Sequence, residues 1–180
     1  MKKGGISVQT ENIFPVIKKW LYSDKDIFIR ELVSNACDAI TKHKRLVSLA
    51  EAEESAEEYK VYLTLDKQLK TLKVSDNGIG MSEEELDKYI NSIALSGALD
   101  FIARYEGEDS KGGGIIGHFG LGFYSAFMVA ANVEIETRSY TAAPAVYWEC
   151  NEHGEYNMED GSKSSRGTDI TPHISEDEAE

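Results

Sequence analysis

The sequence has few cysteines and no long apolar segment. Its 180 residues contain two cysteines, Cys37 and Cys150, and no CxxC pair, so we do not expect a zinc site or a dithiol redox motif of that type. No stretch is long and apolar enough to span a bilayer. The basic N-terminus is not followed by the apolar segment of a secretory signal. We therefore expect reduced thiols and a cytoplasmic location.

Basic residues are also scarce. The chain has 19 Lys and Arg against 32 Asp and Glu, which gives a formal net charge of -13. Nucleic acids and anionic membranes are bound mainly through Lys and Arg, so we expect neither as a partner. An acidic protein can still hold a small phosphate ligand through backbone N–H groups and a metal ion. With 41% hydrophobic and 28% charged residues, residues 1–180 are expected to form a single folded domain.

The spacing of apolar residues predicts both helices and strands. Ser82 and Glu85 form a capping-box pattern, which predicts a helix start. The order of elements favours a mixed two-layer α+β sandwich with helices on one face of the sheet. The expected helices are 12–21, 24–46, a segment from Ser82 and 123–131, and the expected strands are 59–65, 71–75, 133–137, 145–149 and 168–170.

Three polar residues lie close together on the predicted helix 24–46. Glu31, Asn35 and Asp38 follow i, i+4, i+7 spacing, which places them within an arc of about 60° beside the apolar stripe. A carboxylate can activate water for attack on a phosphate, and an amide oxygen suits Mg²⁺. On an arbitrary helix, a solvated margin is the more common explanation of such a pattern.

The segment Asp76–Met81 follows a predicted strand and reads DNGIGM. Asn-Gly is typical of a tight turn, but the second glycine also allows a flat ligand to approach the backbone. Asp76 can accept a hydrogen bond from an exocyclic amine such as that of adenine. The segment therefore indicates either a simple turn or one wall of a base-binding site.

Residues 112–123 are rich in glycine and lead into a predicted helix. Glycines at a helix N-terminus free backbone N–H groups to bind an anion. The sequence GxxxxGK[ST] does not occur, so this segment is not a P-loop. A flexible surface loop is the alternative, but it would have no use for Ile115, Ile116 and Phe119.

The last motif, Arg166–Ile170, is a predicted strand entered through a glycine. Thr168 could place its hydroxyl at the floor of a pocket. Taken alone, this motif is better explained by ordinary β-structure than by a binding site.

Taken together, the motifs point to one family. Segments 27–39, 76–81, 116–131 and 166–170 occur in the order found in the ninety-kilodalton heat-shock chaperones. The chain closely resembles the N-terminal ATPase domain of that family, in a bacterial form, over nearly its whole length. The resemblance implies the Bergerat ATP-binding fold with a mixed, mostly antiparallel sheet, which DNA gyrase, histidine kinases and mismatch-repair ATPases share.

The resemblance also implies a role for each site residue. Glu31 would be the general base that activates the attacking water, and Asn35 would ligate Mg²⁺. Asp76 would bond the adenine amine, helped by a water shared with Thr168. The remaining contacts would be Gly80 and Met81 beside the adenine, Asp38 and Ala39 near the base and ribose, and the backbone of Gly120, Gly122 and Phe123 at the phosphates.

The implied ligands are ATP or ADP with Mg²⁺, and the implied activity is slow ATP hydrolysis. Hydrolysis would drive closure of a lid at about 93–117 and pairing of strand 6–9 with a homodimer partner during the folding of client proteins. Full-length relatives add a middle domain, which supplies an arginine to the γ-phosphate, and a C-terminal dimerisation domain. We expect neither here, so the isolated domain should be monomeric and weakly active, with a loose acidic tail at about 175–180.

Two positions depart from the family pattern, and two other functions remain open. Leu95 stands where the family usually has a basic residue, and Tyr89 where relatives often have Asn near the ribose. A histidine-kinase-type catalytic domain is the main alternative, but it needs no water-activating carboxylate, so Glu31 one turn before Asn35 favours hydrolysis. The other alternative is a non-enzymatic acidic interaction domain in which every glycine is structural.

Overall fold

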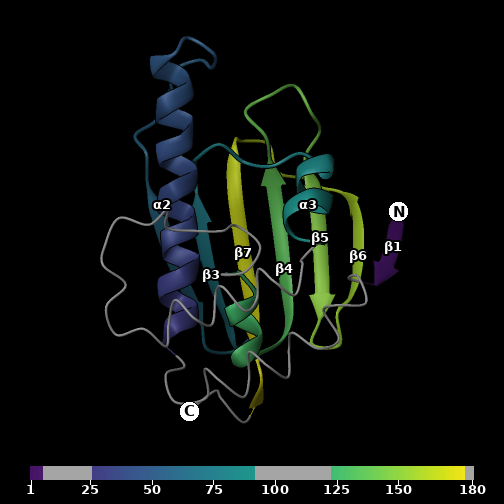
Figure 1. Cartoon of the computed structure of the whole chain (residues 1–180). Helices are drawn as coiled ribbons and strands as arrows, with labels where there is room; N and C mark the ends of the chain where they lie inside the picture. Colours follow the sequence, from purple (N-terminus) through teal and green to yellow (C-terminus); the bar gives the residue numbers. More distant parts are fainter. Residues whose placement is uncertain (6–25, 92–122, 177–180) are drawn as a thin grey trace, which may run out of the picture.

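The computed structural model describes residues 1–5, 26–91 and 123–176, and its strands form one open sheet (Figure 1). This sheet has seven strands in the order β1-β6-β5-β4-β7-β3-β2. Every strand pairing in the described part of the chain is antiparallel, where a mixed, mostly antiparallel sheet was expected. The strands are β1 Lys2–Gly5, β2 Val61–Asp66, β3 Thr71–Asp76, β4 Ala130–Arg138, β5 Val146–Asn151, β6 Glu155–Asp160 and β7 Gly167–Ile174.

Helices cover one face of this sheet, which confirms the α+β prediction (Figure 1). The long helix α2, Ile27–Ser48, buries an apolar stripe that includes Phe28, Leu32 and Ala36. Helix α3, Glu83–Tyr89, begins with the predicted capping box, because the Ser82 hydroxyl accepts from the Glu85 N–H and the Glu85 carboxylate accepts from the Ser82 N–H. No helix in the described ranges is long and apolar enough to cross a membrane.

The hydrophobic core lies between the helices and the sheet. Its largest fully buried side chains include Trp148, Tyr124, Phe123 and Phe127. The Phe123 ring packs edge-on against both Tyr124 and Trp148. Apolar residues of α2, β4, β5 and β7 complete the core, so the sheet is fixed against α2, where the predicted site begins.

The predicted helix 123–131 is confirmed only as far as residue 128 and is wrong beyond it. Residues Ser125–Met128 form a short 3-10 helix, η1, and β4 begins at Ala130. The apolar residues of 123–127 are buried in the core, as the helical spacing suggests. Beyond Val129 the chain instead pairs with both β5 and β7, whose backbone hydrogen bonds take precedence over local helix spacing.

Three further features differ from the sequence predictions. Strands β1 and β6 were not expected. Ser175 was placed in a loose tail, but its N–H and hydroxyl both donate to the Val129 carbonyl, at 2.8 and 3.1 Å. The predicted helix 12–21, strand 6–9, lid 93–117 and tail residues 177–180 lie outside the described residues.

Candidate nucleotide site

Polar atoms of two side chains on α2, Asn35 and Asp38, are buried without hydrogen-bond partners. Asn35 is only 2% exposed, and neither its Nδ2 nor its Oδ1 has a partner. One oxygen of Asp38, Oδ2, is also buried without a partner, and burial raises the pKa of this carboxyl. A buried polar group left unsatisfied costs about 1–3 kcal/mol. The two side chains therefore fit a polar ligand that satisfies them.

Glu31 lies one helical turn before Asn35 and is also buried. Glu31 and Asn35 thus lie buried beside the apolar stripe of α2, and Asp38 is half-buried. The interpretation as a solvated helix margin fails for Glu31 and Asn35, because both are buried.

Asp76 is the last residue of β3, and its side chain is 8% exposed. The Gly78 N–H donates to its Oδ1 at 2.8 Å. Burial raises the pKa of this carboxyl to about 7, because removal from water disfavours the charged form. The Asp76 carboxyl already accepts from one backbone N–H, and it can accept a further hydrogen bond from a ligand amine.

Thr168 lies directly opposite Asp76 in the pairing of β3 with β7. Its hydroxyl lies 2.8 Å from the Thr137 hydroxyl on β4, which also accepts from the Met81 N–H at 2.9 Å. The structure thus brings three predicted residues, Asp76, Met81 and Thr168, to one place through Thr137. No local sequence pattern pointed to Thr137, because its hydrogen-bond partners are distant in the chain.

The turn after β3 also contacts α2. The Ile79 N–H donates to the Ala39 carbonyl at 3.0 Å, and the Ile79 carbonyl accepts from the Tyr140 N–H at 2.9 Å. The turn is therefore bonded to α2 on one side and to the residues after β4 on the other. Ala39 was predicted near the base, and its backbone lies beside the Asp76–Met81 segment.

The glycines beside Asp76, which are Gly78, Gly80 and Gly167, have a different primary role from the one predicted. A Cβ at Gly78 would lie 2.4 Å from the Ala39 backbone, and one at Gly80 (φ +67) 1.8 Å from the Arg138 oxygen. Gly167 (φ +129) would place a Cβ 2.0 Å from the Asp76 oxygen. These glycines therefore permit close approach of the protein backbone to itself, whereas the sequence suggested that Gly78 and Gly80 make room for a ligand.

Arg166 donates hydrogen bonds to the turn that follows Asp76, and it was not predicted as a site residue. Its Nη2 donates to the Asn77 carbonyl at 2.8 Å and to the Ser55 hydroxyl at 3.0 Å, and its Nε donates to the Gly78 carbonyl at 3.0 Å. The guanidinium also lies 5.9 Å from the centre of the Tyr59 ring. Such planar, multiply bonded contacts favour Arg over Lys.

The remaining predicted residues are placed as follows. Met81 and Phe123 are buried residues of the hydrophobic core. Tyr89 is 45% exposed, with the Lys88 ammonium 5.2 Å from its ring centre. Gly120, Gly122 and Leu95 lie outside the described residues.

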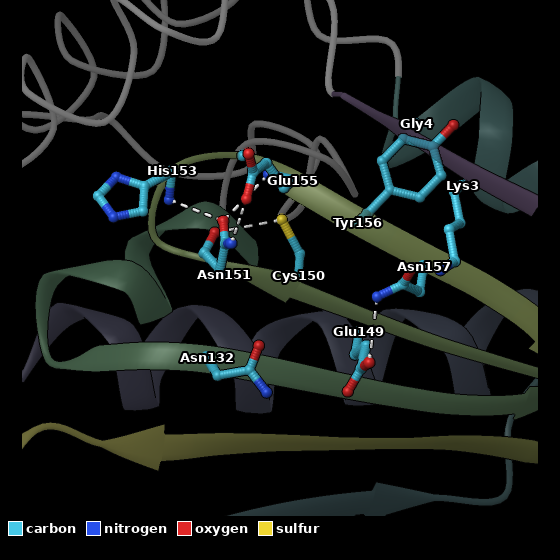
Figure 2. Close-up of a pocket in the computed structure, with 11 residues that line it drawn as sticks. Lys3, Gly4, Asn132, Glu149, Cys150, Asn151, His153, Glu155, Tyr156 and Asn157 are labelled. Atoms are coloured by element: carbon cyan, nitrogen blue, oxygen red, sulfur yellow. Dashed lines mark hydrogen bonds between the residues drawn. The ribbon is translucent and has the colours of Figure 1, made fainter.

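A separate hollow of about 900 Å³ lies where β5 and β6 join, beside β1 (Figure 2). Its polar groups bond to one another: the Asn151 Oδ1 accepts from the His153 and Glu155 N–H groups, and the Asn157 amide donates to Glu149. Cys150 borders it as a free thiol, and burial raises its pKa to about 12. None of the predicted site residues lines this hollow.

Comparisons with known proteins agree with the motifs. Residues 23–176 match the model of the family described as histidine kinase-, DNA gyrase B-, and HSP90-like ATPase. The chain is 51% identical over 180 residues to a chaperone protein HtpG of Porphyromonas gingivalis, 52% over 178 residues to one of Bacteroides fragilis, and 42% over 178 residues to one of Chromobacterium violaceum.

These alignments cover 98–99% of this chain but only 25–28% of each relative, so the chain spans about a quarter of the length of the curated proteins it matches. The resemblance to the heat-shock chaperone ATPases inferred from the four motifs is confirmed. The chain belongs to the family of histidine kinase-, DNA gyrase B- and HSP90-like ATPases.

Proposed function

We propose that this chain is the N-terminal ATP-binding domain of a molecular chaperone, and that it binds Mg-ATP and hydrolyses it slowly. The observation that carries the proposal is the Asn35 carboxamide, buried on α2 with both polar atoms unpartnered. The turn after Asp76 is bonded to the same helix at Ala39. The relatives named as HtpG chaperones support this function over a histidine-kinase domain.

Each residue then has a defined task. Asp76 accepts a hydrogen bond from the adenine amine, and Thr168, opposite it in the sheet, helps through a water. The Asn35 amide oxygen is a hard ligand suited to Mg²⁺, and Mg²⁺ when bound neutralises charge on the phosphates. Glu31, one turn earlier on α2, takes the proton of the attacking water.

Further contacts complete the proposed site. Asp38 and Ala39 lie near the base and ribose, Gly80 and Met81 offer backbone to the adenine, and Phe123 offers backbone to the phosphates. Gly120 and Gly122, outside the described residues, would extend that phosphate contact.

The domain would act within a longer cytoplasmic protein. We propose that ATP closes a lid at about 93–117 and promotes pairing of 6–9 with a second subunit, and that this cycle serves client folding. The arginine that the middle domain supplies in the family would be needed for full turnover. Residues 1–180 alone should therefore be monomeric and hydrolyse ATP weakly.

Calorimetry with ADP and Mg²⁺ tests the proposal directly. The wild-type domain should bind ADP, and Glu31→Ala should bind it with similar affinity while phosphate release from ATP stops. Glu31→Gln is the matched control, because it keeps the shape of the side chain but cannot act as a base. The absence of heat on addition of ADP would favour a non-enzymatic domain and contradict the proposal.

A second assay separates hydrolysis from phosphotransfer. Labelled ATP should yield free phosphate in the presence of Glu31, and no label should reach a histidine of a protein substrate. Label on a protein histidine would identify a kinase domain instead.

A further inference from the structure

Thr137 is a fully buried residue of β4 that no sequence motif pointed to; its exposed fraction is 0%. Its hydroxyl has three polar neighbours. It accepts from the Met81 N–H at 2.9 Å, lies 2.8 Å from the Thr168 hydroxyl, and lies 3.2 Å from the Gly167 carbonyl, to which it can donate. One side chain therefore connects the two chain segments that form the wall around Asp76.

The position of Thr137 in the sheet explains this arrangement. Thr168 pairs with Asp76 on one side and with Thr137 on the other. The three residues form one row across β3, β7 and β4. Met81, at the end of the turn that begins with Asp76, returns to the same row through its N–H.

The count of donors and acceptors couples the Thr168 hydroxyl to Thr137. A threonine hydroxyl has one proton and two lone pairs, and the Met81 N–H occupies one lone pair of Thr137. If Thr137 donates to Gly167, Thr168 must donate to Thr137 and can only accept from a ligand. If Thr137 donates to Thr168, the Thr168 proton is free for a ligand or a bridging water.

We propose that Thr137 is a positioning residue that sets base selectivity by holding the Thr168 hydroxyl and the Met81 backbone in register with Asp76. The inference rests on the proposed nucleotide-binding function and deepens it. Thr137 would not touch the nucleotide; it acts through Thr168 and Met81. Its effect should therefore fall on contacts to the base amine and leave the contacts to the phosphates unchanged.

Thr137→Val tests this role, because valine has nearly the same shape without the hydroxyl. The change leaves the buried Met81 N–H without its acceptor and releases Thr168. Loss of one such buried contact lowers affinity about tenfold. Thr137→Ser keeps the hydroxyl and should restore the wild-type behaviour.

The measurement compares two ligands by calorimetry: ADP, and purine riboside diphosphate, which lacks the exocyclic amine. Wild type should prefer ADP. Thr137→Val should reduce this preference about tenfold, while Thr137→Ser retains it. Thermal unfolding of each variant checks that it is folded, and Thr137→Ala against Thr137→Ser provides the same comparison if Thr137→Val does not fold.

The outcomes separate this inference from the proposed function. If wild type binds ADP and the variant without the hydroxyl loses affinity for both ligands equally, Thr137 has a merely structural role and the inference is overturned. An unchanged preference would overturn it as well. If wild type binds neither ligand, the proposed function fails and the inference fails with it.

Discussion

Asp76→Asn should stabilise the ligand-free protein above pH 7 while it weakens ADP binding. Burial raises the Asp76 pKa from 3.8 to about 7. Each unit of that difference is worth slightly more than 1 kcal/mol, so keeping this carboxylate ionised in the fold costs about 4 kcal/mol. An asparagine carries no such cost. Its NH₂ group would face backbone N–H donors, so the net gain should be smaller than this figure.

The stabilisation expected from Asp76→Asn depends on pH, and the raised pKa of Asp76 sets its direction. Because the folded pKa is raised, between about pH 4 and 7 the folded Asp76 holds a proton that the unfolded chain has lost. Its contribution to stability is therefore complete below pH 3.8 and is lost as pH rises towards 7. The stability of Asp76→Asn relative to wild type should increase through this window and become constant above it.

Urea unfolding at intervals between about pH 4.5 and 8 measures this difference. Asp160→Asn makes the same chemical change at an exposed carboxylate and is the matched control. A stability difference between Asp76→Asn and wild type that does not vary with pH would refute the argument from burial. Calorimetry provides the second readout, since a variant that bound ADP as tightly as wild type would show that the carboxylate does not receive the adenine amine.

Three further substitutions test the framework around Asp76. Gly80→Ala should lower the free energy of unfolding by several kcal/mol, because Gly80 has φ +67 and an added Cβ would lie 1.8 Å from a backbone oxygen. Urea unfolding measures this loss, and Gly154→Ala, at φ 82, is the control for positive φ alone. Arg166→Met should weaken ADP binding about tenfold and Arg166→Lys less, and equal affinities in calorimetry would contradict its role as a clamp. Tyr59→Phe removes the partner 2.6 Å from the buried His43 Nδ1 and should cost about 1–3 kcal/mol in urea unfolding, whereas an unchanged midpoint would show that His43 does not need it.

The parts of the fold and site that could be predicted are those encoded locally. The capping box at Ser82 and the buried edge of α2 at Asn35 were found because each depends on residues within one or two helical turns. The acidic strand end at Asp76 was recognised from its own turn. In contrast, the 123–131 segment was predicted as a helix, because a short apolar run fits helical spacing whether or not strand partners exist.

Thr137 and Arg166 could not be predicted, because their roles depend on distant residues. The Thr137 hydroxyl accepts from Met81, 56 positions earlier, and Arg166 donates to a carbonyl 89 positions earlier. No local pattern identifies which threonine or arginine will meet such a partner. The glycines were noticed for the right reason, the absence of a Cβ, but the group that approaches them is backbone of this protein.

These contacts mean that the proposed base site cannot form before the sheet does. Asp76 ends β3, its cross-strand neighbour Thr168 lies on β7, and Thr137 lies on β4. The turn between Asp76 and Met81 is held at Ala39 of α2. Each of these elements is distant in sequence from the others, so local opening of any one of them removes a contact from the site. A nucleotide that binds only the complete arrangement must therefore stabilise the sheet and α2 together, in proportion to its affinity and concentration.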